Sequence, residues 1–255
     1  MKRVLLKVAY DGTNYCGWQI QPNGITIQGE LNRCLEKILK EPVETIGASR
    51  TDAGVHALGN VAVFDTEARM PADKFSFALN QWLPEDIRIQ KSMEVPLDFH
   101  PRYAKSEKTY EYRILNRTFP LPTERLYSYF YHYDLNPELM EEAGKFLLGE
   151  HDFASFCGAN AQTRTTVREV TGLEVTAKEE MVYIRVKGKG FLYNMVRIIA
   201  GTLIEIGNAQ YAPEKIKEIL EAKNRMAAGP TAPACGLTLM QIRYLKENGN
   251  LINLI

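Results

Sequence analysis

The chain has 255 residues, of which 45% are hydrophobic and 24% charged, a composition typical of soluble globular proteins. Its 31 basic and 31 acidic residues cancel, which excludes nucleic-acid binding through bulk charge but not through a local basic cleft. The four cysteines are too widely spaced for zinc, no apolar run can span a bilayer, and the N-terminus lacks a signal-peptide pattern. We therefore expect a cytoplasmic, reduced and metal-free protein.

The first part of the sequence alternates strand and helix patterns. Residues 4–10 form a mostly apolar run typical of a buried strand. Residues 27–39 then carry apolar side chains at helical spacing, with Thr26 as the expected N-cap and Pro42 as a stop. The further elements expected here are strands over residues 43–48 and 60–66, a helix over 72–81 and a strand over 87–95.

After Pro101 the same kinds of element return. They are expected as a strand over residues 109–115, a helix over 137–148, a hairpin of strands 167–177 and 181–187, helices over 192–206 and 213–222, and a strand over 237–244. The short links between strands favour antiparallel pairing. The sequence therefore predicts an α/β (α+β) fold with two halves, residues 1–104 and 105–255, each a mainly antiparallel sheet flanked by helices.

The loop between the strands expected at residues 43–48 and 60–66 combines several reactive groups. Asp52, Ala53 and Gly54 together are typical of a plain turn, in which the Asp bonds its own backbone and the Gly takes a positive φ. Arg50 and His56 flank this turn, and an apolar strand follows it, as is common for functional loops on a rigid core. From the residues alone, both a structural turn and a functional loop remain open.

Two stretches have a local excess of basic residues. Residues 102–117 contain five basic and two acidic side chains, and residues 181–204 contain four basic side chains and no acid. A solvated strand face is the ordinary interpretation of such runs. Contact with the phosphates of a nucleic acid is the functional alternative.

The segment from Ser49 to His56 resembles the catalytic motif of the tRNA pseudouridine synthase A family, with Ser49 where the family commonly has Gly. Asn60 likewise stands where the family commonly has Gln. The resemblance extends over almost the whole chain, in the family's order, through residues 10–12, 17–19, 26–29, 99–102, 108–112, 190–197 and 232–237.

This resemblance implies a pseudouridine synthase fold and the isomerisation of uridine to pseudouridine at positions 38–40 of the tRNA anticodon arm. It implies a homodimer and neither cofactor nor metal. Asp52 would be the nucleophile, whether it attacks the base or the ribose, and Arg197 would pair with it. Tyr110 would stack on the target base, and Leu237 would line the pocket floor. Arg50 would fill the space that the flipped nucleotide leaves and contact the RNA backbone.

Elementary electrostatics adds a condition to this assignment. Burial in a dry pocket raises the pKa of a carboxyl group, so an ionised Asp52 needs a cationic partner. Arg197 lies within the most apolar helix pattern of the sequence and, if buried, must itself be paired; the alternative is a side chain that extends to the surface. Tyr110 fits either an ordinary core aromatic or a stacking platform beside cations.

Two other classes of function stay open from the sequence. One is an RNA-binding module without catalysis, because two small α/β halves can each present a sheet to RNA. The other is a hydrolase that uses Asp52 with His56 as base, although His56 also fits a structural role or an RNA contact. The hydrolase requires a further orienting acid and an oxyanion site, for which the sequence offers no motif.

Overall fold

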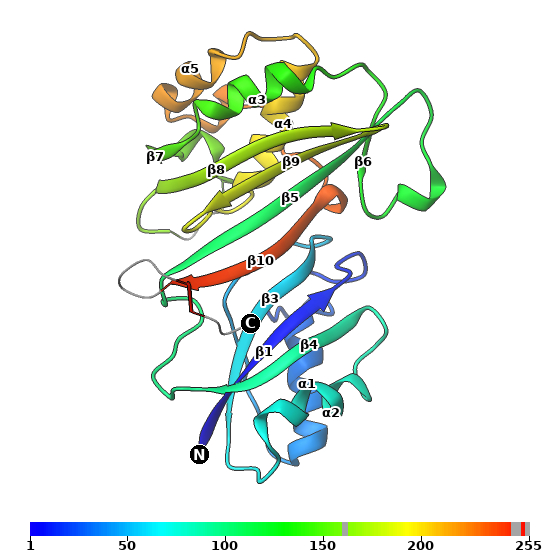
Figure 1. Cartoon of the computed structure of the whole chain (residues 1–255), viewed down its shortest axis with the longest axis vertical. Coiled ribbons are helices and arrows are strands. Elements are labelled where there is room, and N and C mark those ends of the chain that lie inside the picture. Colours follow the sequence, from blue (N-terminus) through cyan, green and yellow to red (C-terminus); the bar gives the residue numbers. More distant parts are fainter. Residues whose placement is uncertain (160–162, 246–250, 253–255) are drawn as a thin grey trace. The chain divides into compact units, whose positions relative to one another are not determined.

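A computed structural model describes residues 1–159, 163–245 and 251–252 (Figure 1). The chain divides into two compact units. Unit 1 contains Met1–Ser106 and the part of the chain from Leu239 onward, and unit 2 contains Glu107–Thr238. The sequence-based halves, 1–104 and 105–255, place the last long strand in the second half, whereas the chain returns to unit 1 at Leu239.

Unit 1 is built on a sheet with the strand order β4-β1-β3-β10. The central strand β1 pairs antiparallel with both β3 and β4, while the short β2 lies beside β3 and β11 beside β10. Both edges of β1 are thus paired, and the burial of its side chains Val4, Leu5, Leu6 and Val8 explains why its sequence is mostly apolar. The strand bounds are β1 (Lys2–Tyr10), β2 (Ile46–Gly47), β3 (His56–Thr66), β4 (Ile87–Val95), β10 (Leu237–Leu245) and β11 (Leu251–Ile252).

Helices α1 (Ile27–Leu39) and α2 (Phe75–Asn80) lie together in unit 1 (Figure 1). The predicted N-cap of α1 is present, because the Thr26 hydroxyl accepts the Gly29 backbone N–H at 3.2 Å. The helix ends at the left-handed residue Lys40, two positions before the expected stop. The single helix expected over residues 72–81 is instead a 3₁₀ turn, η1 (Ala72–Lys74), followed by α2.

Unit 2 has the strand order β5-β9-β8-β7, with β6 parallel beside β5. The hairpin predicted from the sequence is present as β8 and β9, and β5 with β9 and β7 with β8 are antiparallel pairs as well. The predicted class, α/β with mainly antiparallel sheets flanked by helices, is thus confirmed. The strand bounds are β5 (Ser106–Asn116), β6 (Tyr129–Tyr131), β7 (Gly149–Asp152), β8 (Val167–Lys178) and β9 (Met181–Gly188).

Helix α4 (Met195–Gly207) forms the centre of unit 2, with α3 (Pro137–Lys145) packed against it and α5 (Lys215–Ala222) nearby (Figure 1). Every residue of α4 is buried except Arg197 and Glu205, which are half-buried. The apolar pattern is therefore explained by burial on nearly all sides. The short 3₁₀ turns of this unit are η2 (Pro122–Glu124), η3 (Ala154–Phe156), η4 (Arg225–Ala227) and η5 (Ala234–Gly236).

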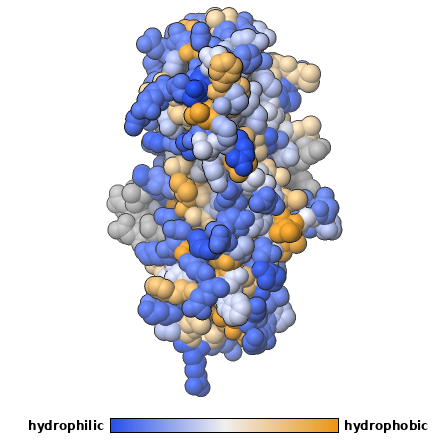
Figure 2. All heavy atoms as spheres, turned by 90° about the vertical axis from the view of Figure 1, so that its right-hand side faces the viewer, coloured by the Kyte–Doolittle hydropathy of each residue, from blue (hydrophilic) through white to orange (hydrophobic). Residues whose placement is uncertain are grey.

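The surface shown in Figure 2 is mostly hydrophilic, and its hydrophobic residues form small separate groups. No helix in the part of the chain that the structure describes is long and apolar enough to cross a membrane. Among the same residues, no group of three or more His, Cys, Asp and Glu side chains is arranged to hold a metal ion.

Candidate active site

The Asp52 loop connects β2 to β3 in unit 1 and contains the turn that the sequence predicts. The Val55 backbone N–H donates to the Asp52 carbonyl at 3.1 Å, and Gly54 has a φ of 77°. The Asp52 side chain is half-buried between the buried residues Thr51 and Val55. One detail of the prediction is wrong, because His56 is not a loop residue but the first residue of β3.

Two glycines from the segment after β1 form the seat of this loop. A Cβ on Gly12 would lie 2.1 Å from the Val55 carbonyl oxygen, and one on Gly17 would lie 2.5 Å from the Thr51 carbonyl oxygen and 3.0 Å from the Asp52 carbonyl carbon. Real Cβ atoms essentially never lie within 3.0 Å of such an atom, so neither glycine can be replaced without a shift of the loop. Gly17 also has a φ of 87°, so two independent constraints favour glycine there. The backbone around Asp52 is therefore held by direct contact.

Buried hydrogen bonds fix the residues just before Asp52. The Tyr10 and Thr51 hydroxyls lie 2.7 Å apart. The fully buried Asn60 amide donates to the Tyr10 hydroxyl at 3.1 Å and to the Ser49 carbonyl at 3.0 Å. Because a buried polar group without a partner costs about 1–3 kcal/mol, the bonds to Thr51 and Ser49 stabilise this conformation of the loop.

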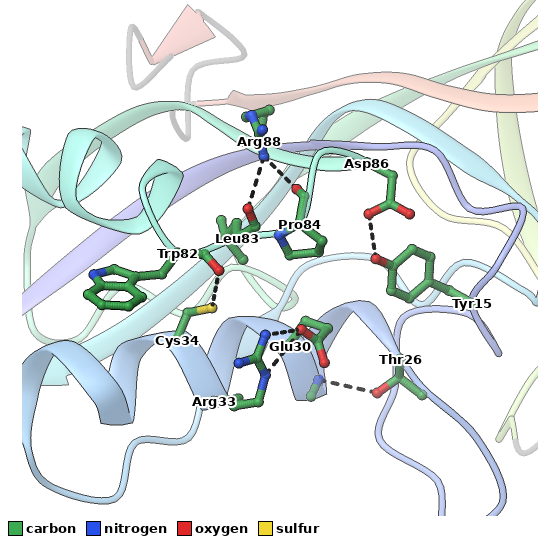
Figure 3. A network of polar contacts seen from close by, with 11 residues as sticks. Tyr15, Thr26, Glu30, Arg33, Cys34, Trp82, Leu83, Pro84, Asp86 and Arg88 are labelled. Atoms are coloured by element: carbon green, nitrogen blue, oxygen red, sulfur yellow. Dashed lines mark hydrogen bonds and ion pairs between the residues drawn. The ribbon is translucent and has the colours of Figure 1, made fainter.

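Tyr15 ties the glycine segment to Asp86, the residue just before the edge strand β4 (Figure 3). Its hydroxyl donates to the Asp86 carboxylate at 2.6 Å, and its carbonyl accepts the Gly54 N–H at 3.3 Å. Burial, followed by the hydrogen bond to Asp86, raises the pKa of Tyr15, so the phenol stays protonated and remains a donor. The turn that carries Asp52 is thereby linked to the start of β4.

His56 faces inward rather than toward a substrate. Its side chain is buried, and its Nδ1 lies 3.1 Å from both the Gly12 nitrogen and the Asp11 carboxylate. Gly12 donates its N–H to this nitrogen. These contacts favour the structural role, in which His56 holds the glycine segment against β3, over that of a base in a hydrolase.

Arg50 and Arg102 bring two positive charges to the edge of the loop. Arg50 is exposed, and the half-buried Arg102 donates to the Gly47 carbonyl at 3.0 Å. Burial lowers the pKa of Arg102, and the neighbouring Arg50 charge lowers it further. The acceptor on Gly47 is neutral, so it orients the Arg102 guanidinium without cancelling its charge.

In unit 2, Arg197 is oriented by neutral groups. Its Nε donates to the Ala232 carbonyl at 2.7 Å, and its Nη1 donates to the Asn194 side-chain oxygen at 3.0 Å. Asn194 lies at the N-cap of α4 with a φ of 59°. Neither acceptor carries a formal charge, so these two contacts position the guanidinium without themselves neutralising its positive charge.

Tyr110 and Leu237 lie near the same segment of unit 2. Tyr110 is 7% exposed and meets the Phe191 ring edge-on, with centroids 5.3 Å apart. The next residue on its face of β5, Tyr112, donates to the Pro233 carbonyl at 2.8 Å. Leu237, 5% exposed, follows four residues later. Residues 232–237 thus join the Arg197 helix to the tyrosine strand.

The five predicted site residues fall into two groups. Asp52 and Arg50 belong to unit 1, whereas Tyr110, Arg197 and Leu237 belong to unit 2. The pairing of Asp52 with Arg197 stays a prediction. The sequence pointed to the glycine segment as part of a resemblance but did not reveal its role, because only the folded chain shows that it packs under the Asp52 turn.

Four of the nine cations of the two basic stretches are paired with acids of unit 2. These pairs are Arg113 with Glu124, Arg117 with Glu180, Arg185 with Glu111 and Lys189 with Glu169, at 3.6, 2.8, 2.6 and 2.6 Å. Residues 181–204 contain no acidic residue in sequence, but the fold brings Glu111 and Glu169 beside the cations of this stretch. This pairing favours the solvated strand face over a dedicated phosphate track.

Comparison with known proteins finds similarity over most of the chain. The family model described as tRNA pseudouridine synthase matches residues 7–104 and 143–245. The chain is 50% identical over 245 residues to tRNA pseudouridine synthase A 2 of Clostridium tetani, covering 95% of this chain and 99% of that protein. It is 45% identical over 244 residues to tRNA pseudouridine synthase A of Caldicellulosiruptor bescii, covering 96% of this chain and 100% of that protein.

Proposed function

Because this chain belongs to the tRNA pseudouridine synthase family and is an isomerase acting on tRNA, we propose that Asp52 is its nucleophile and the anticodon arm its target. The uridines at positions 38–40 are the proposed sites. The observation that carries the proposal is the construction around Asp52. Two glycines and a buried hydrogen-bond network hold the turn that carries the half-buried Asp52 carboxylate, whereas an ordinary surface turn needs no such contacts.

The reaction explains why one held carboxylate is sufficient. Asp52 attacks either the uracil ring or the ribose, the bond between N1 and C1′ breaks, and the ring rotates before C5 bonds to C1′. The proton on C5 then leaves to solvent, N1 carries a proton in the product, and the carboxylate is regenerated. Substrate and product are isomers, so neither an oxidant nor a second substrate is needed. Correct placement of the nucleophile supplies much of the catalysis in such a step.

The remaining site residues have proposed roles in the same step. Arg197 keeps Asp52 ionised, and its anchoring by neutral acceptors supports this role. Tyr110 stacks on the flipped uracil, and Leu237 lines the floor beneath it. Arg50 occupies the space that the flipped nucleotide leaves, which suits its exposed position two residues before Asp52. Base flipping costs a few kcal/mol, which such contacts offset.

Tritium release tests the nucleophile directly. The substrate is an unmodified tRNA transcript labelled with tritium at C5 of uridine, and the proteins are the wild type, Asp52→Ala and the exposed control Asp73→Ala. We expect release by the wild type and the control and none by Asp52→Ala. Release by all three proteins, or by none, would refute the proposal. An RNA-binding module without catalysis predicts the second of these results.

The target positions need a separate measurement. Transcripts in which the uridines at positions 38, 39 and 40 are replaced by cytidine, and any base paired with them by guanosine, keep the stem paired but lose the proposed sites. We expect the wild type to release no tritium from them. Undiminished release would place the target elsewhere in the tRNA and leave the nucleophile assignment intact.

The proposal also includes a cytoplasmic homodimer. The 31 basic residues of one chain are balanced by 31 acidic residues, and a second copy would concentrate basic residues of both copies in one groove. Light scattering coupled to size exclusion gives the mass directly. A mass near the 29.0 kDa of one chain would contradict the dimer.

A further inference from the structure

The turn after β4 holds an exposed aromatic ring that the proposed mechanism does not use. Tyr103 is 80% exposed, and one face of its ring lies on His100, with centroids 4.2 Å apart and planes 24° from parallel. Backbone hydrogen bonds hold both residues in place, since Tyr103 N–H donates to the His100 carbonyl and Arg102 N–H to His100 Nδ1, each at 3.2 Å. The ring is thus supported on one side and open to solvent on the other.

This turn is attached to the strand that leads into the Asp52 loop. Arg102, between the two stacked rings in sequence, donates to the Gly47 carbonyl at 3.0 Å in β2. Gly47 is three residues before Arg50 and five before Asp52. All these residues belong to unit 1, so the open ring, the two arginines and the candidate nucleophile are parts of one compact body.

The chemistry of this cluster matches single-stranded RNA. An aromatic face binds any nucleobase by stacking, and guanidinium groups beside it attract the phosphates of the same strand. We propose that Tyr103 is a stacking platform for an unpaired nucleobase of the tRNA substrate, with Arg102 and Arg50 on the adjoining phosphates. This rests on the proposed function, because the anticodon arm supplies unpaired bases beside the target uridines.

Other exposed aromatics of unit 1 lack this arrangement. The Lys37 ammonium lies 3.8 Å from the Trp82 ring centroid, and the Lys74 ammonium lies 5.5 Å from that of Phe77. Both rings therefore already have a cation near them. Phe77, which is 67% exposed on α2, serves as a matched control because its removal deletes a similar area of exposed ring.

Binding measured in an inactive background separates this inference from the catalytic proposal. Asp52→Ala, alone or with Tyr103→Ala, Tyr103→Phe or Phe77→Ala, is titrated with an anticodon stem-loop RNA and with a fully paired RNA duplex of equal length. We expect Tyr103→Ala to weaken stem-loop binding by about tenfold, the typical effect of losing one stacked base, and to leave duplex binding unchanged. Tyr103→Phe keeps the ring and should retain wild-type affinity, as should Phe77→Ala.

Three outcomes would overturn the inference. These are unchanged stem-loop affinity in Tyr103→Ala, an equal loss in Phe77→Ala, and an equal loss for stem-loop and duplex. A further measurement uses the active enzyme, in which Tyr103→Ala should raise the KM for tRNA and preserve kcat at saturation. Absence of tritium release from the wild type would reject the catalytic proposal. The binding measurements would still test the stacking role of Tyr103, because they do not depend on catalysis.

Discussion

Replacing Gly17 with alanine tests whether the glycine segment positions Asp52. The new Cβ would begin 2.5 Å from the Thr51 carbonyl oxygen, whereas real Cβ contacts essentially never fall below 3.0 Å, so the loop must move by about 0.5 Å. Alanine at a φ of 87° adds about 1–2 kcal/mol of backbone strain, and overpacking adds about 1–3 kcal/mol. We expect the free energy of unfolding to fall by about 2–5 kcal/mol.

The catalytic effect should exceed what strain alone produces. A misplacement of about 1 Å can cost about a hundredfold in rate, so a shift of about half that size predicts a kcat at least about tenfold lower. Gly149→Ala is the matched control, because Gly149 has a φ of 96° but its Cβ would meet only the His151 ring, at 3.9 Å. It should lose about 1–2 kcal/mol of stability and no activity.

The assays are urea unfolding and single-turnover tritium release at saturating tRNA, at a temperature where both variants are folded. Comparing the two alanine variants removes the common cost of a positive φ. Wild-type release by Gly17→Ala would refute the reasoning, because it would mean that the seat of the loop does not set the position of the Asp52 carboxylate. An equal loss of activity in Gly149→Ala would refute it as well.

Two further predictions concern charged groups. Arg197→Met should abolish tritium release, because Asp52 would lose its proposed cationic partner, while circular dichroism still reports a folded protein, since two neutral acceptors lose their donors at about 1–3 kcal/mol each; near-normal turnover would show that Arg197 does not support Asp52. The hydrogen bond from Arg3 lowers the pKa of Asp65 below its ordinary value of 3.8, so this pair stabilises the fold above that pH and loses its contribution as the pH falls through the lowered pKa. Asp65→Asn should therefore be less stable than the wild type at neutral pH and equally stable in strong acid, and a stability difference independent of pH in urea unfolding would contradict this.

Periodicity was sufficient for most elements of the fold. The N-cap at Thr26 and the bounds of β4 follow directly from local sequence, because capping and alternation depend on neighbouring residues. Strands β6 and β7 were not predicted. Every residue of β6 is half-buried, so it shows no alternation, and β7 contains Gly149, Glu150, His151 and Asp152, which have little intrinsic preference for strands.

The position of the last strand shows a different limit of sequence reasoning. Residues near the C-terminus were assigned to the second half because chain order is the only guide to proximity that a sequence offers. In the structure, Tyr244 packs edge-on against Phe99, with ring centroids 5.1 Å apart, and donates to the Pro101 carbonyl at 3.0 Å. These contacts bridge more than 140 positions, and no local pattern in the sequence encodes them.

The basic stretches show the same limit in electrostatic terms. Whether a lysine or arginine attracts RNA depends on which acids lie across the strand register, and a one-residue slip in pairing would change every partner. Arg185 has Glu111 opposite it on β5 and Glu174 opposite it on β8. A cation neutralised on its own sheet has little field left for a phosphate, whereas a contact with a neutral carbonyl, such as that of Arg102 with Gly47, does not cancel the charge of the guanidinium. In a chain of zero net charge, the sites that attract RNA are therefore set by the acceptors of each guanidinium rather than by the number of basic residues nearby.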